Sequence, residues 1–161
     1  EVANIGREFN IPLIIDNTSA PITCKPFEHG ASIVVHSLTK WIGGHGNSIG
    51  GIIVDGGNFD WGKDPERQPL LNTPSPSYHG AIFADFGEVA YISRARVVGL
   101  RDLGPALSPF NAYNFIQGLE TLPLRIRVHF SNAEKVADFL NDHPKIITVI
   151  YPTLHEDEKL K

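Results

Sequence analysis

The chain has 161 residues, of which 42% are apolar and 20% are charged, so it has the balance of a globular domain and not of a disordered chain. Its net charge of −4 gives no electrostatic reason to expect nucleic acid or an anionic membrane as a partner. The single cysteine, Cys24, excludes a disulfide framework and a cysteine-rich metal site.

The two ends of the chain are unusual for a complete protein. The chain begins at Glu1 and contains no methionine, and it ends in the polar segment His155–Lys161. We therefore expect an internal piece of a longer protein, and we expect the isolated piece to be inactive.

Three apolar runs in the first part of the chain predict strands at Ile11–Ile15, Ser32–Val35 and Ile49–Val54. Continuous runs of β-branched residues fit strands that are buried on both faces of a parallel α/β sheet. In such a sheet, the chemistry collects at the carboxyl ends of the strands. Asp16 and the group Ser37–Lys40 directly follow two of these runs and are the first candidate site residues.

The middle of the chain changes character at Asn58. Four prolines interrupt the segment Asn58–Gly80, so it predicts a long ordered surface loop or insertion. Asp85 and Glu88 have the spacing of a capping box, which predicts a helix from there to about Asp102. The pair Gly104-Pro105 ends that helix.

Helices dominate the last third of the chain. Ser108-Pro109 has the form of an N-cap followed by proline, and it predicts a helix that continues through Leu119. Pro123 marks the boundary of a further helix, whose apolar face repeats with helical spacing up to Leu140. Ile146–Tyr151 predicts a strand in a new sheet. The switch from strands to helices indicates a domain change near Leu122.

Lys40 is the strongest candidate for chemistry. A lysine held near apolar walls can lose its proton near neutral pH and attack a carbonyl to form a Schiff base. The hydroxyls of Ser37 and Thr39 can bind a phosphate, and Asp16 can pair with the protonated pyridine nitrogen of pyridoxal phosphate. From spacing alone the alternative is a surface lysine, a capping serine and a strand-end aspartate, all common in loops.

The remaining polar and aromatic residues carry weaker signals. The histidines His36, His45 and His79 do not have the spacing of a zinc site. The glycine pairs at 43–44 and 50–51 predict close backbone packing around the lysine turn. Cys24 is expected to be a small packed side chain, and core or interface packing is expected for the two tryptophans, Trp41 and Trp61.

The order of these motifs resembles the Cys/Met-metabolism family of pyridoxal-phosphate enzymes. The resemblance is carried by Asp16-Asn17-Thr18, Lys25–Ala31, His36–Gly46, Ser48–Gly51, Arg101–Pro105, Leu107–Asn111, Gln117–Leu122, His143-Pro144 and Tyr151-Pro152. It covers nearly the whole chain. The long segment 58–80, with Tyr78-His79-Gly80 and Arg101–Pro105, is most similar to the O-acetylhomoserine sulfhydrylases within that family.

The resemblance implies a role for each candidate site residue. Lys40 would be the Schiff-base lysine and proton shuttle, and Asp16 the partner of the pyridinium nitrogen. Thr18 would lie near the cofactor ring, and Ser37 and Thr39 would contact the phosphate. The implied cofactor is pyridoxal 5'-phosphate, with no metal. The implied reaction replaces the acetate of O-acetyl-L-homoserine with sulfide or a thiol and gives homocysteine.

The resemblance also implies the architecture. The fold would be the α/β fold-type I of these transferases, with 1–122 in the large cofactor-binding domain and 123–161 at the start of the small C-terminal domain. The partners would be an amino-acid substrate and sulfide or a thiol, without nucleic acid or membrane. We expect a cytoplasmic homotetramer whose active sites are shared between subunits.

Two alternatives stay open at this stage. The protein can be a relative of cystathionine γ-synthase, cystathionine γ-lyase or methionine γ-lyase, with the same lysine and another nucleophile or an elimination step. It can also be a catalytically silent paralogue that acts as an interaction subunit, which the departures from the family pattern at Ser19 and Thr153 allow. The presence of Asp16 and Lys40 favours an enzyme.

Overall fold

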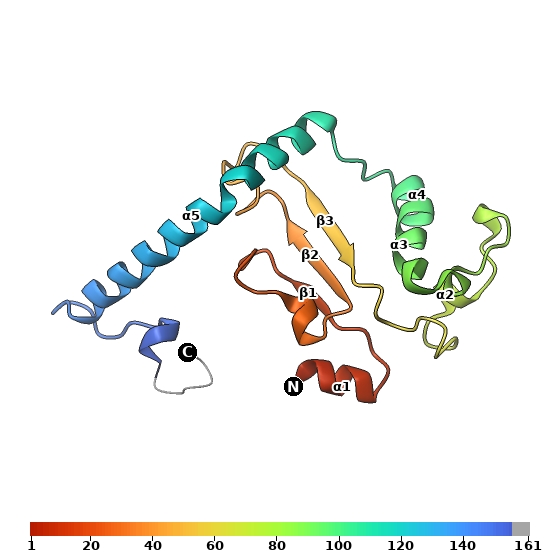
Figure 1. The fold of residues 1–161 in the computed structure, drawn as a ribbon, viewed down its shortest axis with the longest axis horizontal. Coiled ribbons are helices and arrows are strands. Elements are labelled where there is room, and N and C mark those ends of the chain that lie inside the picture. The colour runs from red at the N-terminus through yellow and green to blue at the C-terminus, as the bar shows by residue number, and fades with distance from the viewer. Residues whose placement is uncertain (156–161) are drawn as a thin grey trace. The chain divides into compact units, whose positions relative to one another are not determined.

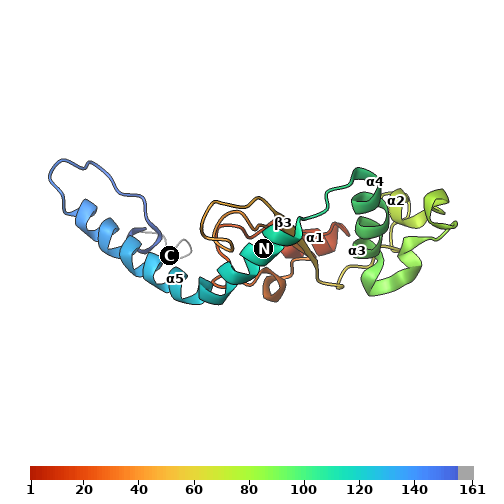
Figure 2. The same cartoon turned by 90° about the horizontal axis from the view of Figure 1, so that it is seen from above.

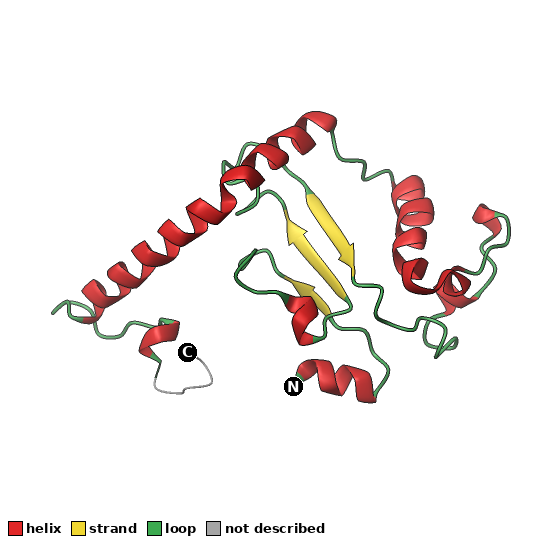
Figure 3. Cartoon of the chain, in the orientation of Figure 1, coloured by secondary structure: helices red, strands yellow, loops and turns green. Residues whose placement is uncertain are grey.

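A three-stranded sheet lies in the first part of the chain and consists of β1 (Ile14–Asp16), β2 (Ile33–Ser37) and β3 (Gly51–Asp55), in that order (Figure 1). The structure is a computed structural model, and it describes residues 1–155. All three predicted strands are present, although β1 begins only at Ile14. The combination of a small sheet with helices confirms the expected α/β class (Figure 3).

The strand directions differ in part from the prediction. β1 pairs in parallel with β2, as expected, with Asp16 opposite Val35. β3 is antiparallel to β2, because the chain returns from Ser37 to Gly51 at the same edge of the sheet instead of crossing over. The carboxyl ends of β1 and β2 therefore lie at the same end of the sheet as Gly51, the first residue of β3.

A hydrophobic cluster holds this first part together. Its buried members come from β2, from the segment 58–80 and from the helical region that follows, and they are Ile33, Trp61, Leu71, Phe83 and Ala90. The segment 58–80 is thus more than a surface loop, since it contributes Trp61 and Leu71 to the core. It also contains the short helix α2 (Pro69–Asn72) and a 3-10 turn at Pro76–Tyr78. The indole of Trp61 stacks on Tyr91 at 5.1 Å, which confirms the expected packing role of Trp61.

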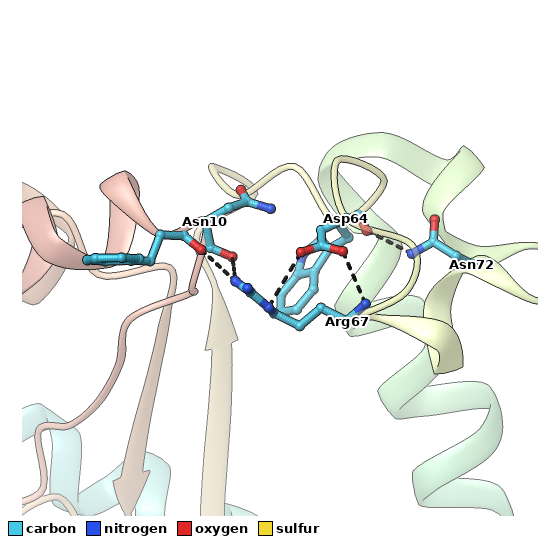
Figure 4. A network of polar contacts seen from close by, with 6 residues as sticks. Asn10, Asp64, Arg67 and Asn72 are labelled. Atoms are coloured by element: carbon cyan, nitrogen blue, oxygen red, sulfur yellow. Dashed lines mark hydrogen bonds and ion pairs between the residues drawn. The ribbon is translucent and has the colours of Figure 1, made fainter.

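Polar contacts fix the segment 58–80 to the start of the chain, where α1 (Val2–Glu8) lies (Figure 4). The guanidinium of Arg67 donates hydrogen bonds to the carbonyls of Phe9 and Asn10 and pairs with Asp64 at 3.4 Å. The amide of Asn72 donates to the carbonyl of Trp61 at 2.9 Å. The two bonds to Phe9 and Asn10 bridge residues that lie more than fifty positions apart in sequence, while the other two contacts lie within the segment 58–80.

The helix predicted from Asp85 begins later than expected. Gly87 adopts a φ of 60° and a ψ of −125°, which breaks the helical path, so the capping-box prediction is wrong. The continuous helical stretch consists of α3 (Ala90–Arg94), a π-helical turn at Ala95–Leu100 and α4 (Arg101–Leu103). Its predicted end is confirmed, because Gly104 caps it with a φ of 73°.

One helix replaces the two that were predicted for the last third of the chain. α5 (Pro109–Asn141) contains Pro123 in its interior. Its ribbon is continuous in both views (Figures 1 and 2). Proline fixes φ near the helical value and removes one backbone donor, so it does not have to end a helix whose neighbouring turns are stable. The predicted boundary at Pro123 is therefore wrong.

The chain separates into two compact units, Glu1–Leu119 and the residues from Glu120 onward, and the division falls inside α5. The predicted strand Ile146–Tyr151 does not form. A strand needs a neighbouring strand as its hydrogen-bonding partner, and no described strand pairs with this segment, in which Ile147 is fully exposed. A 3-10 turn at Pro152–Leu154 follows instead. No helix within residues 1–155 has the length and apolar content to cross a membrane.

Candidate active site

The turn that follows β1 is tied to the end of β2. The backbone N–H of Asn17 donates to the carbonyl of Val35 at 2.9 Å, which extends the parallel ladder past Asp16. The backbone N–H of Ser37 donates to the hydroxyl oxygen of Thr18 at 2.7 Å. Asn17 is buried, and its side-chain amide donates to the carbonyl of Cys24 at 3.1 Å. Asp16, Thr18 and Ser37 are thus held together at the edge where β1 and β2 end.

The carboxylate of Asp16 is set up to carry a negative charge. The hydroxyl of Thr18 lowers the pKa of Asp16 most, followed by the backbone N–H of Thr18, which donates at 2.9 Å, and by the charge of His36. The Thr18 oxygen accepts from Ser37, so its own proton remains available to Asp16. Asp16 is exposed and ionised at neutral pH, ready to pair with a cation.

Lys40 lies in a loop that is closed on itself, and we call residues Leu38–Gly50 the lysine loop. The backbone N–H of Leu38 donates to the carbonyl of Gly50 at 2.9 Å and closes the base of the loop. The hydroxyl of Thr39 accepts from the N–H of Gly50 at 3.2 Å. The carbonyl of Lys40 accepts from Gly44 at 2.8 Å, while its amine is exposed and has no partner among residues 1–155.

The glycines of the lysine loop allow a close approach of α5. A methyl group added at Gly50 would lie 2.5 Å from the ring of Phe115, and one added at Gly43 would lie 3.1 Å from the same ring. Both distances are too short for ordinary contact. The predicted role of these glycines in close packing around the lysine turn is confirmed.

The structure also locates the weaker candidates. The ring of His45 is hydrogen-bonded to the carbonyl of Gly43 at 2.8 Å, and the buried Nδ1 of His36 has no partner among the described residues. No group of metal-ligating side chains occurs within residues 1–155. Cys24 is exposed, so the expectation of a packed side chain is wrong: its carbonyl, and not its sulfur, faces the buried Asn17.

Several residues that build the site were not candidates from the sequence. Asn17 and the α5 residues Asn111, Asn114 and Phe115 hold the backbone around Asp16 and Lys40. Asn17 lies within the motif Asp16-Asn17-Thr18, so the sequence indicated its position next to the site. Asn111 also lies within a sequence motif, Leu107–Asn111, whereas Asn114 and Phe115 lie more than sixty positions from the loop they contact, so only the fold reveals those two.

The side chains of Asp16, Ser37, Thr39 and Lys40 fit pyridoxal phosphate. An ionised carboxylate suits a protonated ring nitrogen, an unpartnered amine suits an aldehyde carbon, and the hydroxyl of Ser37 suits a phosphate oxygen. The hydroxyl of Thr39 already closes the lysine loop through Gly50, so it would contribute to phosphate binding from a fixed position.

Comparison with known proteins gives a consistent result. A family model described as "Cys/Met metabolism PLP-dependent enzyme" matches residues 1–161. The O-acetyl-L-homoserine sulfhydrylase of Leptospira meyeri is 53% identical over 98% of this chain and 37% of its own length. The homocysteine synthase of Schizosaccharomyces pombe is 46% identical over 99% of this chain and 38% of its own.

A solved structure agrees with these relatives. A crystal structure of an O-acetylhomoserine (thiol)-lyase from Campylobacter jejuni, which contains an N'-pyridoxyl-lysine-5'-monophosphate, matches with a TM-score of 0.89. The match has 43% identity and covers 95% of this chain and 38% of the other. The chain therefore spans little more than a third of the length of the proteins it matches.

Proposed function

Because this chain belongs to the Cys/Met-metabolism family of pyridoxal-phosphate-dependent enzymes, with their fold-type I architecture, we propose that it is part of an O-acetylhomoserine sulfhydrylase. The whole protein would replace the acetate of O-acetyl-L-homoserine with sulfide or a thiol and release homocysteine or its thioether. This is a transferase reaction of methionine and cysteine biosynthesis. Support comes from relatives that are named for this reaction and match nearly the whole chain.

One structural observation carries the proposal. The ionised carboxylate of Asp16 and the hydroxyl of Ser37 lie at one edge of the sheet, and the loop that bears Lys40 starts directly after Ser37. Pyridoxal phosphate, when bound, supplies an electron sink that stabilises negative charge next to the substrate's amino group. Asp16 would hold the proton on the ring nitrogen, because a carboxylate with a lowered pKa keeps its charge beside a cation.

The other residues divide the remaining tasks. Lys40 would hold the cofactor through its amine and would then remove and return protons at Cα and Cβ of the substrate. These transfers would allow acetate to leave from Cγ and sulfide or a thiol to bond to Cγ in its place. Ser37 and Thr39 would bind the phosphate. Thr18 would lie near the ring and would keep Asp16 ionised through its hydroxyl.

Three further parts of the proposal concern organisation. We propose a large-domain part in 1–122 and a small-domain part in 123–161, which is supported by the separation of the chain between Leu119 and Glu120. A homotetramer with active sites shared between subunits, and a cytoplasmic location, are proposed from the family resemblance.

A comparison of nucleophiles tests the function. Full-length protein with bound pyridoxal phosphate is given O-acetyl-L-homoserine and either sulfide or cysteine, and the products are measured. We expect homocysteine from sulfide with a kcat/KM well above that for cystathionine formation from cysteine. A preference for cysteine would identify a cystathionine γ-synthase instead, and no turnover with either nucleophile would favour a silent paralogue.

A further inference from the structure

One face of α5 packs along the lysine loop. The residues that make the contacts are Asn111, Asn114, Phe115 and Gly118, whose spacing of three, one and three places them on one side of the helix. All four lie in the first compact unit, together with the loop they contact. The contact therefore belongs to one packed body.

The contact is close along its whole length. Phe115 is only 3% exposed, and its ring lies against Gly43 and Gly50, where added methyl groups would come within 3.1 and 2.5 Å. At Gly118, an added methyl group would lie 2.3 Å from the carbonyl oxygen of Ile42. Any larger side chain at these glycines would force the lysine loop and α5 apart.

Two side-chain hydrogen bonds from α5 fix the position of the lysine loop along the helix. The amide of Asn111 donates to the carbonyl of Ile49 at 3.1 Å. The amide of Asn114 donates to the hydroxyl of Ser48 at 3.1 Å, and Ser48 is buried. Both bonds reach the returning arm of the loop. The ring of Phe115 contacts both arms, at Gly43 and at Gly50, and Gly118 contacts the arm that follows Lys40.

The contact holds the loop backbone on both sides of Lys40. The Lys40 amine has no partner among residues 1–155, so its place is set by the backbone of the loop. We propose that Phe115 and Asn114 of α5 are positioning residues for the proposed catalytic amine of Lys40. The packing of the lysine loop against α5 would place this amine for reaction, so that disturbing the packing lowers kcat. This inference rests on the proposed function, because it assumes that Lys40 reacts.

Substitutions at the contact between Gly50 and Phe115 test the proposal in the full-length holoenzyme. Gly50 has no positive φ, so Gly50→Ala disturbs the contact through its methyl group and not through backbone strain. We expect Gly50→Ala to lower kcat by about 10- to 100-fold, because displacements of about 1 Å have such effects, with a smaller change in KM. The pH at which the absorption band of the lysine-bound cofactor changes should move as well.

A double variant separates positioning from general damage. Phe115→Leu alone should lower kcat, since the ring that packs against Gly43 and Gly50 of the lysine loop is lost. In Gly50→Ala/Phe115→Leu the smaller side chain makes room for the new methyl group, so kcat and the band titration should recover toward the parent. Gly99→Ala and Phe83→Leu are the matched controls, since Gly99 has open space around it and Phe83 lies in the separate core cluster.

The outcomes are distinguishable. Parent-like kcat and titration in Gly50→Ala and Phe115→Leu, or equal losses in the two controls, would overturn the proposal. If Gly50→Ala fails to fold, Asn114→Ala decides in its place, with Asn58→Ala as its control, because each loses one side-chain hydrogen bond. Reductive attachment of the cofactor to a lysine other than Lys40 in the parent would instead refute the proposed function.

Discussion

The hydrogen bond between Thr18 and Ser37 offers the sharpest test of how the ends of β1 and β2 are held together at the candidate site. Thr18→Val keeps the shape of the side chain but removes the hydroxyl that accepts from the backbone N–H of Ser37 at 2.7 Å. A buried donor without a partner costs about 1–3 kcal/mol. Because the site is only partly buried, we expect the lower end of that range, about 1 kcal/mol of unfolding free energy.

The same substitution changes the pKa of Asp16. The hydroxyl of Thr18 is the largest cause of its lowered pKa, so this pKa should rise in Thr18→Val. A carboxyl with a lowered folded-state pKa stabilises the protein above its unfolded-state pKa, and this contribution is lost as pH falls through the folded-state pKa. The acid-side loss of stability should therefore be shallower in Thr18→Val, and the acid limb of the activity profile should move to higher pH.

Denaturant unfolding of the full-length protein across the acid range measures both effects, with kcat/KM followed over the same pH values. Thr18→Ser is the control, because it keeps the hydroxyl and should stay close to the parent. Equal behaviour of Thr18→Val and the parent would refute the reasoning. A loss in Thr18→Ser as large as in Thr18→Val would show that the methyl group matters and the hydrogen bond does not.

Three further substitutions test the site and the core. Asp16→Asn should keep the cofactor bound but reduce kcat far more than cofactor occupancy, measured by absorbance and turnover, because an amide does not stabilise a protonated ring nitrogen. Lys40→Ala should abolish turnover while the thermal transition stays near that of the parent, since its amine has no partner within residues 1–155. Trp61→Ala should lower the unfolding free energy by about 3–5 kcal/mol in denaturant titrations, because Trp61 is 6% exposed and stacks on Tyr91. Parent-like turnover in either site variant, or a Trp61→Ala effect below about 1 kcal/mol, would contradict these expectations.

Local signals in the sequence were enough to predict the elements around the site. The β-branched runs gave the three strands, and the polar residues after them gave Asp16 and Lys40 as candidates. The direction of β3 was not predictable in this way, because it depends on how the chain returns through the lysine loop. The contact of Phe115 with Gly43 and Gly50 is likewise a tertiary feature, although the glycines themselves indicated close packing.

The errors have physical causes. The capping-box spacing at Asp85 was overridden by the positive φ of Gly87, and the breaking tendency of Pro123 was overridden by the turns of α5 on both sides. Ile146–Tyr151 has strand composition, but composition alone does not supply a pairing partner. The segment 58–80 was interpreted from its prolines, whereas the burial of Trp61 and Leu71 decides its structure.

Reductive trapping of the cofactor tests the central claim most directly. Full-length protein with bound pyridoxal phosphate is treated with borohydride, digested and mapped by mass spectrometry. The account predicts that the pyridoxyl group is attached to Lys40, at the start of the lysine loop. Attachment to any other lysine, or a cofactor that is released without attachment, would contradict it.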